Sequence, residues 1–150
     1  MKFLHLSDLH LGKRLNAFSL LEDQQYMLSQ LCDIVEREQT DAVILAGDIY
    51  DKAVPSAEAV QLFDHFLSRL AQLHQTVLLI SGNHDSPERI AFGASLMESS
   101  HVHIAPVFSG TIAPVVLHDA YGEIFCWLLP FVRPAQVRPF FPDAAIGGFQ

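Results

Sequence analysis

Residues 41–51 read DAVILAGDIYD, and the architecture of the chain can be worked out from this stretch. Its apolar run from Ala42 to Ala46 is short and continuous, which is typical of a fully buried strand. The run stops at Gly47, where the backbone can turn sharply and approach a ligand closely. Asp48 follows at once, so the stretch predicts a buried strand that presents a carboxylate at its carboxyl end.

The same arrangement occurs on both sides of this stretch. The apolar residues 3–6 end at SDLH, residues 7–10, and the apolar residues 77–80 end at SGNHD, residues 81–85. Each run is short enough for a strand and leads into a polar loop. We therefore predict three buried strands, each followed by side chains that carry oxygen or nitrogen ligands.

Helical spacing of apolar residues separates the three runs. Within residues 22–38, apolar residues recur at the spacing that places them on one face of an amphipathic helix: Met27, Leu31, Ile34 and Val35. A second helix is predicted after Ser56, a residue type that caps free N–H groups, with an apolar face of Val60, Phe63, Leu67 and Leu70. The alternation predicts an α/β fold with parallel strands and helical crossovers.

The pattern changes in the second half of the chain. A shorter helix is predicted over residues 88–97, after the turn signal Ser86-Pro87. Strands are predicted at residues 101–107, 111–117 and 123–129, with intervening Gly-containing turns that are typical of antiparallel hairpins. Residues 130–142 hold four prolines without periodicity and are predicted to form a loop.

Composition excludes several classes of protein. With 150 residues, of which 50% are hydrophobic, the chain is neither disordered nor too small for a core. No apolar run approaches the roughly 20 residues of a membrane span, and the two cysteines are expected to be reduced, as in the cytoplasm. A net charge of −8 argues against nucleic-acid binding through positive charge alone, but not against acidic groups that bound cations neutralise.

The three strand ends carry the chemistry. Asp8-Leu9-His10, Gly47-Asp48 and Gly82-Asn83-His84-Asp85 each follow a predicted strand. Because the carboxyl ends of parallel strands line one crevice, we expect these loops to meet there. Together they offer carboxylates, a carboxamide and imidazoles without thiolate, a donor set that suits Mn²⁺, Fe²⁺ or Zn²⁺.

These motifs resemble those of the calcineurin-like metallophosphoesterases. The flanking residues 5–13, the Pro55-Ser56 pair and the LLPF of residues 128–131 are similar to the nuclease members of that family. The resemblance implies a two-sheet β-sandwich core flanked by helices. It also implies that residues 1–150 are the N-terminal part of a metallophosphoesterase domain that continues beyond residue 150.

The resemblance assigns the metal ligands. Two divalent ions, with Mn²⁺ as the expected metal, would be held near the ends of the strands. Asp8 and His10 would hold one ion, Asp48 would bridge both, and Asn83 would bind the second through its carboxamide oxygen. The family adds three later histidines that this chain does not supply, since His101-x-His103 falls on an expected ordinary strand. We therefore expect the chain alone to bind metal weakly and to have little nuclease activity.

The resemblance also assigns catalytic and supporting residues. His84 would act beside the metals as an acid or as a stabiliser of the transition state, and Asp85 would orient or polarise it. Asp51 is expected to support Asp48 or to cap a helix. The basic residues that flank the motif loops are candidates for contacts with the DNA backbone: Lys13, Arg14 and Arg89.

The implied function is that of a metal-dependent DNA nuclease subunit. It would hydrolyse phosphodiesters at DNA ends and hairpins in repair and recombination, in the cytoplasm beside the nucleoid. The resemblance further implies an ATPase partner subunit and a homodimer, with no role for a membrane. Two alternatives stay open: a phosphoesterase of the same superfamily that acts on small molecules, and a catalytically inert scaffold.

Overall fold

Four parallel strands form the main sheet in the computed structural model, which describes residues 1–144 and 146–147. They are β1 (Phe3–Leu6), β4 (Ala42–Ala46), β5 (Thr76–Ile80) and β6 (Val102–Ile104), in the spatial order β1-β4-β5-β6. The three strands predicted with helical crossovers are confirmed. The expectation of an antiparallel partner at residues 101–107 was wrong, because this segment pairs in parallel with β5 and buries Val102 and Ile104 in the same core.

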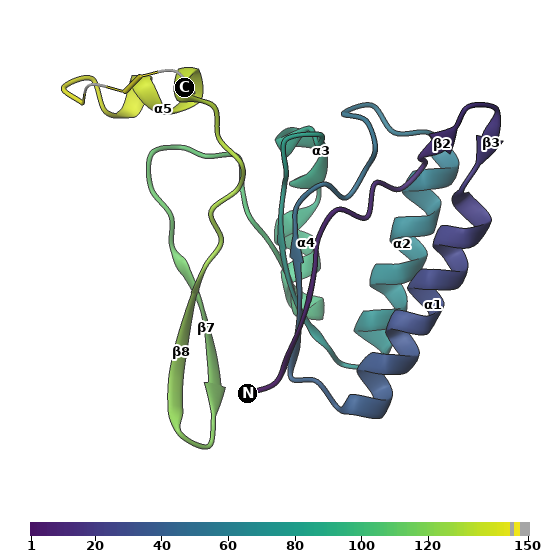
Figure 1. Cartoon of the computed structure of the whole chain (residues 1–150). Helices are drawn as coiled ribbons and strands as arrows, with labels where there is room; N and C mark the ends of the chain where they lie inside the picture. Colours follow the sequence, from purple (N-terminus) through teal and green to yellow (C-terminus); the bar gives the residue numbers. More distant parts are fainter. Residues whose placement is uncertain (145, 148–150) are drawn as a thin grey trace.

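Two long helices cover one face of this sheet, α1 (Leu21–Glu38) and α2 (Ala57–Gln72) (Figure 1). Ser56 caps α2 as predicted, since its Oγ accepts a hydrogen bond from the Ala59 N–H at 3.3 Å. The buried face of α1 differs slightly from the predicted one: Met27 is exposed, and Cys32 lies at the centre of the buried stripe. Both helices pack on the side chains of alternate strand positions: Val43, Leu45, Val77 and Leu79.

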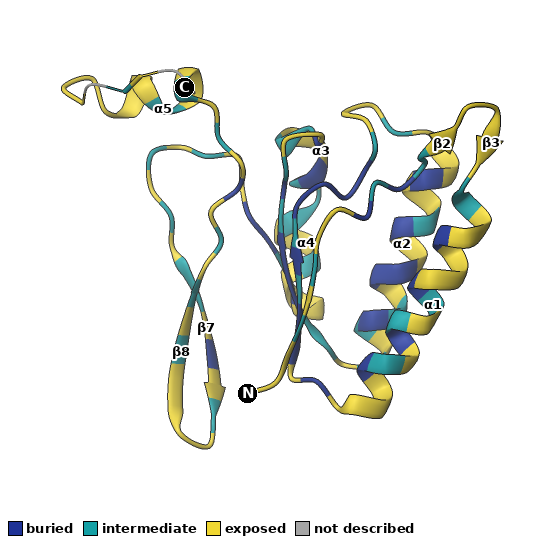
Figure 2. Ribbon diagram, viewed as in Figure 1, coloured by how far each residue is buried: buried dark blue, intermediate teal, exposed yellow. Residues whose placement is uncertain are grey.

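A β-hairpin packs on the opposite face of the sheet. Its strands are β7 (Pro114–Asp119) and β8 (Gly122–Trp127), which pair antiparallel across the predicted Tyr121-Gly122 turn. Leu117 of β7 packs against Ala42 and Leu78, which lie on the sheet face away from α1 and α2. Figure 2 shows that β8 is largely exposed on its outer side. The chain thus has a parallel sheet between helices and a second layer of β-structure, in agreement with the predicted fold class.

The remaining elements are short. The helix predicted over residues 88–97 is split into α3 (Pro87–Ile90) and α4 (Ala94–Met97), because Gly93 between them adopts a positive φ of 73°. The two-residue strands β2 (Arg14–Leu15) and β3 (Phe18–Ser19) form a short antiparallel hairpin before α1. The 3₁₀ helix η1 (Glu98–Ser100) follows α4, and α5 (Pro134–Val137) and η2 (Arg138–Phe140) lie in the segment expected to be a loop.

None of the helices in the described residues combines the length and the hydrophobicity that a membrane span requires.

Candidate metal centre

The loops after β1 and β4 run side by side at the carboxyl end of the sheet, the upper edge in Figure 1. The Asp8 N–H donates to the Gly47 carbonyl at 3.2 Å, and the His10 N–H donates to the Asp48 carbonyl at 2.9 Å. These bonds continue the pairing of the two strands into the loops. The residues that were predicted to ligate metal therefore approach one another through their backbones.

Three of these residues have an unusual backbone conformation. Asp8, His10 and Asp48 have φ values of 56°, 44° and 51°, in the left-handed region that residues other than glycine rarely adopt. Such residues each cost on the order of 1–3 kcal/mol and cluster at functional sites, where the surrounding structure holds them. The strain indicates that the loops are shaped for the position of their side chains rather than for stability.

The side chains of the three loops meet at one point. Ligand atoms of His10, Asp48 and His84 lie within 4.8 Å of one another. The His10 Nε2 is 3.7 Å from the Asp8 Oδ1 and 4.0 Å from the Asp48 Oδ2. The convergence predicted from the strand ends is confirmed, and it includes His84 among the residues able to bind an ion.

The environment of His10 fits a metal ligand. Within the described part of the chain, its buried Nδ1 has no hydrogen-bond partner, which is uncommon for a buried polar atom. The nearest carboxylate to this atom is that of Asp51, whose Oδ1 is 3.9 Å away. Metal-bound histidines usually direct their second ring nitrogen to a carboxylate or carbonyl group. In His10, Nε2 faces Asp8 and Asp48, and Nδ1 faces the Asp51 carboxylate at 3.9 Å without a hydrogen bond.

Two glycines let the loops after β4 and β5 touch. A Cβ atom on Gly47 would lie 2.8 Å from the Gly82 Cα, and a Cβ atom on Gly82 would overlap the Oδ1 and N atoms of Asp48. The close approach brings the His84 N–H within 3.0 Å of the Asp48 Oδ1, to which it donates a hydrogen bond. Asp48 is thus fixed by one oxygen while its other oxygen faces His10.

The His84 ring is held by the loop that follows β4. Its Nδ1 lies 3.2 Å from the backbone carbonyl oxygen of Asp51. Because a carbonyl oxygen only accepts hydrogen bonds, this contact requires the proton on Nδ1. With Nδ1 engaged in this way, Nε2 is the ring nitrogen that can exchange a proton with the substrate or bind a metal ion.

Asp85 has a different place from the one predicted. Its buried carboxylate accepts hydrogen bonds from the N–H groups of Ile49, Tyr50 and Gly82 at 3.1, 3.0 and 2.8 Å. These bonds join the loop after β4 to the loop after β5. Asp85 therefore positions the backbone of the centre, whereas the His84 ring contacts the Asp51 carbonyl and, edge-on, the His10 ring.

This position predicts the effect of changing Asp85 to asparagine. An asparagine amide lacks the negative charge that strengthens the three hydrogen bonds, and its NH₂ group would face a backbone N–H donor. The free energy of unfolding should therefore fall by about 2–3 kcal/mol. Urea unfolding of metal-free protein measures this, with the exposed Asp23 of α1 changed to asparagine as the control. Equal midpoints for the two variants would contradict the assigned role.

Tyr50 supports the same loop through packing. Its ring contacts Phe63 edge-on at a centroid distance of 5.7 Å. Burial raises the pKa of Tyr50 to about 12, and the nearby Asp85 carboxylate adds to this effect. The hydroxyl group is therefore neutral at physiological pH, and Tyr50 is not a base in the centre.

Asn83 lies next to the cluster and lines a neighbouring space. It borders a cavity of 360 Å³ together with residues from two separate parts of the chain: Gly82, Asp85, Pro87, Phe131, Arg133 and Gln136. Asn83 is exposed, so its carboxamide is accessible. Its role as a ligand of a second ion stays a prediction.

The basic residues chosen from the sequence lie in different surroundings. The Lys13 Nζ is 3.9 Å from the Asp51 Oδ1, at the rim of the centre. The Arg14 guanidinium donates to the Ala17 carbonyl in the β2–β3 turn, and Arg89 lines a cavity between α2 and α3 with Phe63. Of these three, Lys13 is the one that the structure brings to the centre. Arg133 was missed, because it lies far along the sequence in the predicted loop.

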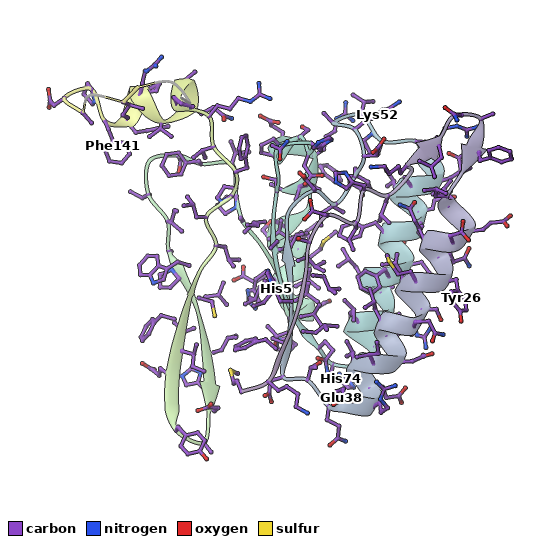
Figure 3. The ribbon with its side chains drawn as sticks, in the orientation of Figure 1. His5, Tyr26, Glu38, Lys52, His74 and Phe141 are labelled. Atoms are coloured by element: carbon purple, nitrogen blue, oxygen red, sulfur yellow. The ribbon has the colours of Figure 1, made fainter. Side chains whose placement is uncertain are left out.

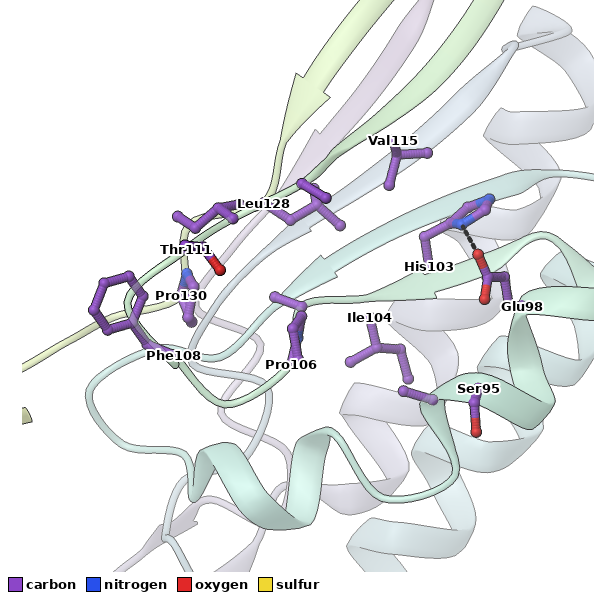
Figure 4. A pocket seen from close by; sticks show the side chains of 14 residues that line it. Ser95, Glu98, His103, Ile104, Pro106, Phe108, Thr111, Val115, Leu128 and Pro130 are labelled. Carbon is purple, nitrogen blue, oxygen red and sulfur yellow. Dashed lines mark ion pairs between the residues drawn. The ribbon is translucent and has the colours of Figure 1, made fainter. Parts of the chain in front are cut away.

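His101-x-His103 does not join the centre. His103 lies at a separate, largely apolar cavity of 340 Å³, where its Nδ1 is 3.9 Å from the Glu98 Oε1 (Figure 4). Burial lowers the pKa of His103 there. His5 and His74 also lie below the upper edge of the sheet, as the labels in Figure 3 show.

Comparison with known proteins identifies the family of the chain. The chain matches the calcineurin-like phosphoesterase family over residues 1–143. It is 36% identical over 147 residues to the D component of the nuclease SbcCD from Staphylococcus saprophyticus, an alignment that covers 97% of the chain and 38% of that relative. It is also 36% identical over 151 aligned residues to the D component of the nuclease SbcCD from Staphylococcus epidermidis, which covers 100% of the chain and 39% of the relative. The chain thus spans about two fifths of the length of these relatives, and it belongs to the calcineurin-like phosphoesterase family.

Proposed function

We propose that the chain is the metal-binding part of a DNA nuclease subunit of the SbcD type. The observation that carries the proposal is the meeting of Asp8, His10, Asp48 and His84 at one edge of the parallel sheet. The family hydrolyses phosphoesters, and the two staphylococcal relatives are named as nuclease subunits. A phosphodiester of DNA is the substrate that fits both the family and the names of these relatives.

The ligands in this proposal are those that the family resemblance assigns, and the geometry of the strand ends supports them. Asp8 and His10 would hold one divalent ion, Asp48 would contribute to both ions, and Asn83 would hold the second, with Mn²⁺ as the expected metal. The Asp48 carboxylate suits this task because one of its oxygens accepts from the His84 N–H while the other faces His10. Divalent ions, when bound, would neutralise charge on the phosphate oxygens and lower the pKa of a bound water molecule toward neutral pH.

His84 handles the proton in this proposal. Its Nδ1 donates to the Asp51 carbonyl, which fixes the ring and leaves Nε2 as the nitrogen that can transfer a proton. Protonated at Nε2, the imidazole gives its proton to the leaving oxygen of the phosphodiester as the bond breaks. Asp85 keeps the two loops in register while this happens.

DNA and protein partners complete the proposal. Two divalent ions contribute +4 where the phosphate backbone arrives, so the net charge of −8 does not prevent binding. Val60 and Phe92 line one cavity at α2 and α3 and are 43% and 83% exposed, which favours a protein partner on that side. We assign an SbcC-type ATPase and a second copy of the subunit as partners, in the cytoplasm beside the nucleoid.

Comparing two substrates tests the function. The full-length protein with Mn²⁺ should cleave double-stranded DNA ends, and His84→Ala should lower that rate by about 10²–10⁴-fold, the range of an acid–base group. His65→Ala, on the exposed side of α2, is the matched control and should keep the wild-type rate. Hydrolysis of bis-p-nitrophenyl phosphate is measured in parallel.

Two outcomes would overturn the proposal. Turnover of the small ester without DNA cleavage would favour a phosphoesterase for small molecules. A full-length protein that is inert with Mn²⁺, Fe²⁺ and Zn²⁺ on both substrates would favour the scaffold alternative.

A further inference from the structure

We propose that Arg133 binds a phosphate group of the DNA strand beside the metal centre, in the cavity that it shares with Asn83. This inference rests on the proposed function, since it names a contact of the same substrate. The cavity measures 360 Å³ and opens where the loop after β5 meets the segment that follows β8. Its walls therefore come from two groups of residues about fifty positions apart in the sequence: Gly82, Asn83, Asp85 and Pro87, and Phe131, Arg133 and Gln136.

The segment that carries Arg133 is fixed to the loop of the metal centre. The Phe131 N–H donates to the Ser81 carbonyl at 2.9 Å, and Ser81 directly precedes Gly82 and Asn83. The Arg133 N–H donates to the Gln136 Oε1 at 2.8 Å. Pro134 further restricts the Arg133 backbone to the extended region, where it lies at φ −89° and ψ 150°. These contacts fix the backbone position from which the Arg133 side chain extends, at the cavity that Asn83 also lines.

The charges around the cavity favour an anionic ligand that arrives from outside. Asp85 also lines the cavity, but its carboxylate is occupied by three backbone N–H groups. Within residues 1–144 and 146–147, no carboxylate forms an ion pair with Arg133, whereas Lys13 is already paired with Asp51. Arg133 is therefore a cation in the cavity beside the centre, and the described residues form no ion pair with it.

The residue type and its neighbours indicate which anion fits. An arginine guanidinium presents a planar fork of N–H donors that matches two phosphate oxygens. A phosphodiester that reacts at the metal centre is followed along the strand by another phosphate, and the cavity adjoins the centre through Asn83. The Phe131 side chain lines the same cavity and offers an apolar wall to the sugar or base between the two phosphates. The ligand is thus the phosphate next to the one that is cleaved.

Salt dependence of DNA binding tests this contact directly. Binding of a fluorescent oligonucleotide to the full-length protein is measured by anisotropy over a range of KCl concentrations, on a His84→Gln background that slows cleavage. Loss of one phosphate contact should lower the slope of log K against log[salt] by about 0.7–0.9. Arg133→Gln should show this decrease and weaken binding by about tenfold, whereas Arg133→Lys should keep the slope because it keeps the charge.

Arg138 supplies the matched control, since it lies exposed five positions along the chain and is not among the residues lining the cavity. Arg138→Gln should leave the slope and the affinity unchanged. In the enzyme with an intact His84, Arg133→Gln should also lower the ratio of kcat/KM for DNA to kcat/KM for bis-p-nitrophenyl phosphate by about tenfold. The small ester has no neighbouring phosphate, so it does not use the proposed contact.

The outcomes separate this inference from the proposed function. If wild-type protein cleaves DNA but Arg133→Gln matches Arg138→Gln in slope and ratio, the Arg133 contact is wrong and the nuclease function stands. If wild-type protein cleaves neither substrate, both proposals fail. An Arg133→Gln protein that binds DNA normally but loses affinity for a protein partner would instead assign this cavity to an acidic protein segment.

Discussion

Changing Asp48 to asparagine should remove metal-dependent phosphodiester hydrolysis from the full-length protein almost completely. Asp48 is the carboxylate that contacts both other loops of the centre, with Oδ1 at the His84 N–H and Oδ2 facing His10. An asparagine amide offers one oxygen and no charge, so it cannot hold two cations. Loss of a supporting residue of a metal site costs roughly 10–100-fold in affinity or activity, and loss of this ligand should cost more than 100-fold.

Two measurements check this expectation. Calorimetric titration with Mn²⁺ reports the affinity, and hydrolysis of bis-p-nitrophenyl phosphate reports the activity. Asp64→Asn, at an exposed position of α2, controls for the loss of a negative charge and should change neither value. Wild-type Mn²⁺ affinity in the Asp48→Asn protein would show that the ions bind elsewhere.

Changing Gly82 to alanine should also lower the activity strongly. The added Cβ would overlap the Oδ1 and backbone N of Asp48, so the loops after β4 and β5 would have to separate. Overpacking of this kind costs about 1–3 kcal/mol of folding free energy. The displacement also matters for chemistry, since a misplacement of about 1 Å can cost 10²-fold in rate. We therefore expect a folded protein with about 100-fold lower activity.

The control for this variant is a glycine with free space around it. Among residues 1–144 and 146–147, no atom lies within 4 Å of a Cβ placed on Gly147, so Gly147→Ala should keep wild-type stability and activity. Thermal unfolding and ester hydrolysis are measured on both variants. Equal hydrolysis by Gly82→Ala and wild-type protein would contradict the close packing of the two loops.

The main sheet and the place of the metal centre could be predicted because their signals are local. The apolar runs that end at Asp8, Asp48 and Asn83 specify buried strands, and the geometry of parallel sheets brings the strand ends together. The confirmed cap at Ser56 is likewise a local signal. Among the details that the sequence did not predict are the parallel pairing of β6, the split of the helix at Gly93, and the short helices α5 and η2. Pairing depends on contacts with β5, and an isolated glycine does not reveal the sign of its φ.

The supporting residues of the centre could not be predicted in full, because their roles depend on three-dimensional contacts. Asp85 is adjacent to His84 in the sequence, yet its carboxylate bonds to the backbone of Ile49, Tyr50 and Gly82. The contact of the His84 ring with Asp51 is made by a carbonyl oxygen, a group that every residue carries. A sequence pattern reports residue types and therefore does not show which backbone group lies beside a ring.

Anomalous diffraction from crystals soaked in Mn²⁺ would show whether the three strand ends hold metal. We expect a strong anomalous peak within coordination distance of the Asp8 and Asp48 carboxylates and the His10 Nε2, and its loss in Asp48→Asn crystals. A peak at another surface, or an Mn²⁺-saturated crystal without density between these three side chains, would contradict a metal centre at this edge of the sheet.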